Sequence, residues 1–208
     1  MLSLDHLVWT VPSLEKGIED FERLTGVRAA VGGRHPGRGT CNALASLGHG
    51  AYLEIVAPDP TQALSGNYGE MLARRPHEGL ITFVMTAPDM AASQLAAVHA
   101  GVPWQGPVPL SRQTPDGRLL EWRLAYTEGT EYGEWLPYYI DWQQTAHPAT
   151  TSPSGLTLLG FEVSHPQADA LHAIYAALGI DIPVRRAARP GMRALLSCPL
   201  GQAVLTSL

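Results

Sequence analysis

The sequence predicts an α+β fold made of tandem β-α-β-β-β modules. Three observations indicate it: a strand-like apolar run ending at a proline occurs three times, a stretch with helical periodicity follows each run and stops at a glycine, and short strand-like runs divided by Gly and Pro follow each helix. Repeated units of this kind bury their apolar faces against one another. We therefore expect the three copies to pack alike.

The first unit spans about residues 1–60. Its opening strand leads into Pro12, and a helix is predicted over residues 13–25, with Ser13 as the N-cap and Gly26 in the left-handed position that ends it. One face of this helix is apolar, at Leu14, Ile18, Phe21 and Leu24. Strands are predicted after it over residues 28–31, 42–47 and 51–57.

The second unit spans about residues 79–142 and has the same order of elements. A strand leads into Pro88, Asp89 is a suitable N-cap, and Gly101 ends a helix with a weaker apolar stripe. This stripe consists of Met90, Leu95 and Val98. Strands are predicted after it over residues 108–113, 118–127 and 135–142.

The third unit, about residues 156–208, is a shorter β-α-β-β-β-like copy. Its helix ends at Gly179 and carries an apolar stripe of Leu171, Ile174, Tyr175 and Leu178. Strands are predicted after it over residues 183–186, 193–198 and 203–207. Residues 58–78 and 143–155, rich in Pro, Thr, Gly and Ser, are predicted to link the units of a single domain over residues 1–208.

The composition excludes several classes of protein. The chain has 208 residues, 45% of them hydrophobic, and a formal net charge of −5. Without a basic block or a long apolar run, neither nucleic acid nor a membrane is an expected partner. Cys41 and Cys198 are too few for a disulfide framework, and the first residues lack the pattern of a secretory signal. These features predict a cytoplasmic protein.

Four motifs resemble one known family. They lie at residues 4–8, 33–44, 52–59 and 136–142, the last followed by His147 and a proline. Together they are similar to the glyoxalase-like domain family of the vicinal oxygen chelate superfamily, which includes glyoxalase I, extradiol dioxygenases and bleomycin- and fosfomycin-resistance proteins. The resemblance implies that each module curls into a half-barrel sheet and that paired modules enclose a cup. In the superfamily, metal ligands come from the first and last strands of each module.

His6 and Glu54 occupy those two positions in the first module. An imidazole and a carboxylate suit a divalent ion of Fe, Mn, Zn, Ni or Co, so the resemblance implies a metal cofactor. A buried histidine bonded to backbone is the alternative for His6. A carboxylate within an apolar strand is costly unless it is paired, metal-bound or protonated, and the alternative for Glu54 is that it points outward.

The second module tests the metal hypothesis by internal alignment. Matching Thr10 to Thr86 sets His6 against Thr82, a poor ligand. The last strands can be aligned so that Asp141 matches Glu54, which gives the candidate ligand set His6, Glu54 and Asp141. A slip of one residue would turn Asp141 outward, because strand side chains alternate.

Other polar and aromatic residues are candidates for catalysis or substrate binding. Glu54 or His35 would move a proton in the reaction. The candidates for binding the substrate are Arg34, Asn42, Arg112, Tyr139 and His147. The alternative for the glycine-rich segment of residues 32–40 is a flexible connection between strands. The alternative for the arginines that alternate with aromatic residues after residue 110 is a solvated face of the sheet.

Two classes of function follow from the resemblance, and they remain alternatives. The first is a metal-dependent enzyme, an isomerase, lyase or dioxygenase, that stabilises an enolate of a small oxygen-rich substrate. The second is a metal-free protein of the resistance type that binds and sequesters a small molecule. In a third possibility, only the fold is kept and the protein acts through partners. The third unit would either complete the sheet of the second module or mediate a homodimer.

Overall fold

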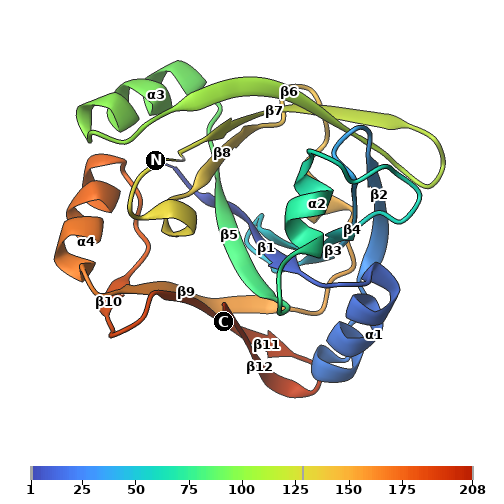
Figure 1. The fold of residues 1–208 in the computed structure, drawn as a ribbon. Helices are drawn as coiled ribbons and strands as arrows, with labels where there is room; N and C mark the ends of the chain where they lie inside the picture. The colour runs from blue at the N-terminus through green and yellow to red at the C-terminus, as the bar shows by residue number, and fades with distance from the viewer. Residues whose placement is uncertain (1, 128, 208) are drawn as a thin grey trace.

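The computed structural model describes residues 2–127 and 129–207. Eight strands from the first two units form a closed barrel in the order β1-β4-β3-β2-β6-β7-β8-β5, and four strands from the third unit form a separate sheet beside it (Figure 1). The predicted α+β class and the tandem modules are confirmed. Among the described residues, no helix has the length and apolarity needed to cross a bilayer.

The first module supplies half of the barrel. It consists of β1 (Leu4–Thr10), α1 (Leu14–Thr25), β2 (Ala30–His35), β3 (Thr40–Ser46) and β4 (Tyr52–Pro58). Gly26 ends α1 at φ 77°, and its N–H donates to the carbonyl of Glu22. Ile18 and Phe21 are buried as predicted, but Leu24 is 43% exposed, so the buried stripe of α1 is narrower than its apolar pattern.

The second module repeats this order. It consists of β5 (Gly79–Thr86), α3 (Met90–His99), β6 (Gln105–Gln113), β7 (Leu119–Tyr126), the short 3-10 helix η1 (Gly133–Trp135) and β8 (Tyr138–Asp141). Asp89 caps α3 by accepting from the N–H of Ala92. The predicted stripe of α3 is wrong at two positions, since Leu95 and Val98 are exposed while the small residue Ala97 is buried.

The two modules join at two seams. β1 pairs with β5 in antiparallel fashion over most of its length. β2 meets β6 at a single register pair, Arg34 with Gln113. Gly33 permits this contact at φ 139°, because a Cβ atom there would overlap the backbone carbonyl of Gln113. Closure of the barrel therefore depends on the absence of a side chain at Gly33.

The predicted linker of residues 58–78 contains a short helix, α2 (Tyr68–Ala73). Asn67 caps α2 by accepting from the N–H of Glu70. Leu72 packs into the apolar cluster that includes Val8 and Val56 of the barrel. This segment is therefore packed onto the barrel rather than being an open connection.

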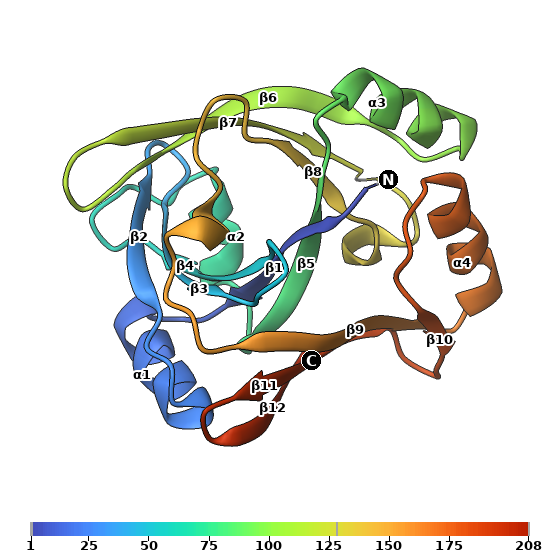
Figure 2. The ribbon, with the colours of Figure 1, turned by 180° about the vertical axis from the view of Figure 1, so that it is seen from behind.

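The third unit consists of β9 (Thr157–His165), α4 (Ala168–Ala177), β10 (Val184–Arg186), β11 (Gly191–Cys198) and β12 (Gly201–Thr206). The helix η2 (Pro148–Thr150) lies in the segment that leads to it. The order of its sheet is β10-β9-β11-β12, whereas in the barrel modules the first strand pairs with the last. Because this sheet is separate, it does not complete the sheet of the second module (Figure 2).

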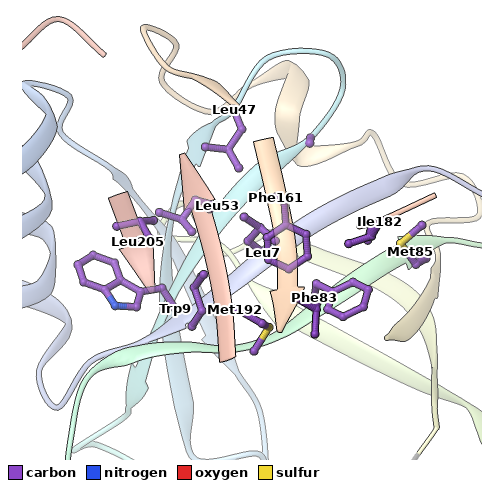
Figure 3. Packing of buried hydrophobic residues seen from close by; sticks show 14 of the residues in the cluster. Leu7, Trp9, Leu47, Leu53, Phe83, Met85, Phe161, Ile182, Met192 and Leu205 are labelled. Atoms are coloured by element: carbon purple, nitrogen blue, oxygen red, sulfur yellow. The ribbon is translucent and has the colours of Figure 1, made fainter. Parts of the chain in front are cut away.

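The third sheet packs against the outer face of the barrel. The rings of Phe83 on β5 and Phe161 on β9 lie 5.3 Å apart, and Leu7, Met192 and Leu205 belong to the same buried cluster (Figure 3). Residues that alternate with these on β1 and β5 point to the barrel interior. The third unit therefore supports the outside of the strands that carry the site.

Candidate functional site

The interior of the barrel contains a cavity of about 760 Å³, counting the space at its mouth, which we call the cup. Most of its polar lining comes from the first module: His6, His35, Thr40, Asn42 and Glu54. Most of its apolar lining comes from the second module: Val84, Leu110, Trp122, Leu124 and Ile140. The wall from the first module is therefore the more polar of the two, and the wall from the second module is mainly apolar but also carries Thr82, Arg112 and Tyr138.

Asp5 is a buried residue beside His6 that was not among the predicted site residues. The register of β1 against β5 shifts between Leu4 and His6, which leaves Asp5 as an extra residue in the strand. Such a bulge re-aims side chains, and here Asp5 lies beside the His6 ring. Its carboxylate is 1% exposed and accepts hydrogen bonds from the side chains of His6 (2.7 Å), His147 (3.1 Å), Trp142 (3.1 Å) and Thr86 (3.1 Å).

This network fixes which ring nitrogen of His6 and of His147 faces the Asp5 carboxylate. Burial raises the pKa of the Asp5 carboxyl, but hydrogen bonds from His147 and His6 outweigh burial and hold the pKa well below its usual range. An ionised carboxylate only accepts, so the Nδ1 atom of His6 must carry a proton. The Nε2 atom of His6 faces away from Asp5 into the cup, and it lies 3.8 Å from an oxygen of Glu54.

Glu54 lies between two histidines. Its side chain accepts a hydrogen bond from Asn42 Nδ2 at 2.6 Å, and its other near neighbours are His6 Nε2 and His35 Nε2, each 3.8 Å away. Strand alternation explains its placement, because Tyr52, Glu54 and Val56 face the cup while the residues between them face the core. The structure thus brings together four of the candidate residues, His6, His35, Asn42 and Glu54, and the predicted alternative of an outward Glu54 is wrong.

Burial lowers the pKa of His35, while the nearby Glu54 raises it and Arg112 and Arg38 lower it further. A folded-state pKa below the unfolded one means that the unfolded chain takes up a proton first as the pH falls. The contribution of His35 to the free energy of unfolding is therefore fully present above about pH 6.5. Below that pH it declines, by up to about 1.4 kcal/mol per pH unit for one proton.

We expect His35→Gln to reduce this decline between pH 7 and pH 5. Urea unfolding at several pH values measures it, with the exposed His172→Gln as the control. Equal slopes in wild type and His35→Gln would contradict the assignment.

Arg112, a candidate for binding the substrate, lies inside the cup and not on a solvated sheet face. It is 6% exposed, and burial lowers the pKa of its guanidinium while Tyr52 and Glu54 raise it. Its Nε atom has no hydrogen-bond partner among the described residues.

Four candidates from the sequence analysis do not line the cup. Ile140 and Trp142 face it, so Asp141 between them faces outward, where it pairs with Arg123 at 2.5 Å. Tyr139 is fully buried in the main core against Trp104, and Arg34 is mostly exposed, 3.6 Å from Asp59. His147 lies behind the site as a donor to Asp5.

The strand registers show why the internal alignment failed at Asp141. In the first module Thr10 pairs with Val56, and in the second Thr86 pairs with Ile140. Stepping back along both strands, Glu54 then corresponds to Tyr138, three residues before Asp141. Side chains alternate between the two faces of a strand, so an error of three residues, an odd number, also placed Asp141 on the wrong face of the sheet.

The same registers define four equivalent positions in the cup: His6, Glu54, Thr82 and Tyr138. A hydroxyl and a phenol at the last two are poor ligands for the metals that the superfamily binds. Among residues 2–127 and 129–207, no group of three or more His, Cys, Asp or Glu side chains is arranged to hold an ion. The donor set does not fit a resident metal, and the predicted ligand set is not assembled.

Three comparisons with known proteins agree with this architecture. The glyoxalase-like domain family matches residues 4–179. A hypothetical protein from Staphylococcus aureus is similar at 14% identity over 91% of this chain and 88% of that chain, with a TM-score of 0.73. A hypothetical protein from Bacillus halodurans matches at 14% identity, 67% and 91% coverage and a TM-score of 0.50.

Methylmalonyl-CoA epimerase from Mycobacterium tuberculosis is similar at 20% identity over 66% of this chain and 85% of that chain, with a TM-score of 0.49. No protein of curated function matches the chain. The family match covers both barrel modules and continues through α4, and the barrel carries His6 and Glu54 at the two positions that the motifs implied. The chain therefore belongs to the glyoxalase-like domain family of the vicinal oxygen chelate superfamily.

Proposed function

We propose that the protein is an enzyme of the isomerase or lyase type that moves a proton at a carbon atom next to a carbonyl group of a small substrate. The observation that carries the proposal is the line from Asp5 through His6 to Glu54 in the polar wall of the cup. A base held by a second group and facing a further acid or base is the arrangement that proton transfer requires.

The roles follow from the geometry. His6 Nε2 removes the proton from carbon, and the electron pair of the broken C–H bond delocalises into the carbonyl to give an enolate. Glu54, held by Asn42 and 3.8 Å from His6 Nε2, takes the proton from the imidazolium of His6 and returns it to the same carbon or to its neighbour, which restores the carbonyl group and both side chains. Asp5 stabilises the imidazolium that forms, and it keeps Nε2 as the reacting atom. No step requires a resident metal.

A metal-free binding protein is the second candidate, and the apolar lining from the second module favours it. Such a protein would retain a ligand in the cup without changing it. Hydrogen exchange separates the two functions, because an enzyme that forms an enolate in D2O replaces carbon-bound hydrogen by deuterium even where no net product accumulates.

The test is an NMR assay of deuterium incorporation with 2-oxo acids, hydroxyketones and ketones as probes. We expect wild type to accelerate exchange in at least one probe, and Glu54→Gln to slow that exchange about 10²-fold, at the low end of general acid–base effects. Glu121→Gln changes an exposed carboxylate on β7 and is the matched control.

Metal analysis by plasma mass spectrometry completes the test. We expect no stoichiometric metal and no loss of exchange after chelation. Metal that is present in wild type and lost in both His6→Ala and Glu54→Ala would overturn the metal-free mechanism. Tight binding of a probe without any exchange would favour the second candidate.

A further inference from the structure

The guanidinium of Arg112 is a charge buried in the cup that forms no direct ion pair with a described residue. Among the described residues, no carboxylate oxygen lies within 4.0 Å of it, and Glu54 is instead shared between Asn42 and the two histidines. Only 6% of the surface of Arg112 is exposed. A buried charge costs free energy unless it is paired. An unpaired guanidinium facing a cavity is therefore suited to bind the anionic group of a ligand.

The backbone beside Arg112 is shaped to admit its side chain. Arg112 lies on β6, at the narrow seam where β2 and β6 meet. A Cβ atom at Gly32 would lie 2.8 Å from Nη1 of Arg112 and would overlap Oδ1 of Asn42. The glycine therefore leaves the space through which the guanidinium reaches the polar wall, and the position of Arg112 is built into the barrel.

The charges around the site favour a monoanion. Glu54 lines the same wall as a carboxylate, and the other arginine of the cup lining, Arg38, makes a hydrogen bond to Tyr126 and lies over the ring of Tyr68. A dianion such as a phosphate would lie on the same wall as the Glu54 carboxylate, and of the two arginines in the described lining only Arg112 is buried. A carboxylate is planar and singly charged, and it matches the fork of a guanidinium.

The apolar side chains beside Arg112 indicate the character of the part of the ligand that extends from its carboxylate. Leu110 lies two residues before Arg112 and on the same face of β6, and Trp122 pairs with Leu110 across the sheet. An apolar or aromatic group extending from the carboxylate would pack on these side chains.

We propose that the cup binds a small monocarboxylate with an apolar or aromatic body, held by Arg112 through its carboxylate. This inference rests on the proposed function for the reaction, and it names the substrate class. A carboxylate on Arg112 turns the carbon atoms next to it toward the polar wall, where His6 and Glu54 lie. In a 2-oxo acid, the C–H bond beside the oxo group is the one exposed to this pair.

The experiment measures binding by titration calorimetry with matched probes: phenylpyruvate, phenylacetate and hexanoate as acids, and phenylacetone and hexanol as neutral counterparts. We expect wild type to bind at least one acid more tightly than its counterpart. Arg112→Met should weaken binding of the acid about 10- to 100-fold, as for the loss of charged hydrogen bonds, and Arg112→Lys should give an intermediate value. Arg118→Met, on the exposed hairpin, is the control.

The folded state of each variant is checked by thermal unfolding, and Arg112→Met is expected to be at least as stable as wild type because it removes an unpaired buried charge. Failure of every acid to bind, or equal binding of an acid by wild type and Arg112→Met, would overturn the inference. Acid binding that depends on Arg112 without deuterium exchange would leave it standing and remove the proposed function. If neutral ketones exchange as fast as the acids, and Arg112→Met exchanges as fast as wild type, the proposed function would stand and the inference about Arg112 would be overturned.

Discussion

Asp5→Asn is expected to lower the rate of deuterium exchange on the order of 10²- to 10⁴-fold while leaving the backbone of the cup in place. The Asp5 carboxylate accepts hydrogen bonds from four donors. The amide of an asparagine would place an NH2 group, which donates and cannot accept, against some of them. The amide would favour the other tautomer of His6, in which Nε2 carries the proton and cannot remove one from carbon. The NMR exchange assay measures the loss.

The same variant is expected to destabilise the protein by about 2–4 kcal/mol, because it breaks a buried charged network. The depressed pKa of Asp5 means that its stabilisation is present above about pH 4 and is lost as the pH falls through the lower folded-state value. Asp141→Asn is the control, since this carboxylate faces outward. Unchanged exchange in Asp5→Asn would show that His6 is not the base.

Gly33→Ala is expected to destabilise the protein by about 3 kcal/mol or more, or to prevent folding. A methyl group at Gly33 would overlap the carbonyl oxygen of Gln113, and the φ of 139° is itself unfavourable for alanine. Since β2 and β6 pair only here, the strain cannot be relieved without opening the barrel. Guanidinium unfolding measures the free energy.

The control for this prediction is Gly37→Ala. Gly37 also has a positive φ, 71°, but a Cβ atom there would meet nothing within 4 Å. We expect a cost of about 1 kcal/mol, that of the left-handed conformation alone. Equal costs at the two glycines would mean that the seam tolerates a side chain.

Most of the fold could be predicted because it depends on local signals. Proline and glycine mark the ends of the strands and of α1, and the order of elements in all three units agrees with the structure. The stripe of α3 could not be predicted from apolarity. This helix places Ser93 and Ala97 against the molecule and leaves Leu95 and Val98 exposed, a choice made by tertiary packing.

The site was harder to predict because it depends on which face each side chain occupies. His6, His35, Asn42 and Glu54 line the same cavity, and for these four the residue type and the motif had pointed to one place. Tyr139 and Asp141 were placed on the wrong face by a three-residue error in aligning the last strands of the modules. Asp5 was missed because a bulge, invisible in the sequence pattern, places it beside the His6 ring.

The division of the cup between a polar and an apolar wall has a consequence for how the protein could diversify. Substitutions at Leu124 or Ile140 would change which ligands fit without altering His6 or Glu54, which lie on strands of the other module. Trp122 is different, because its ring lies edge-on to that of His35, with 6.0 Å between the centroids. Effects at sites that share no partner are close to additive. Ligand selectivity and proton transfer can therefore be varied separately, with Arg112 as the residue that couples them.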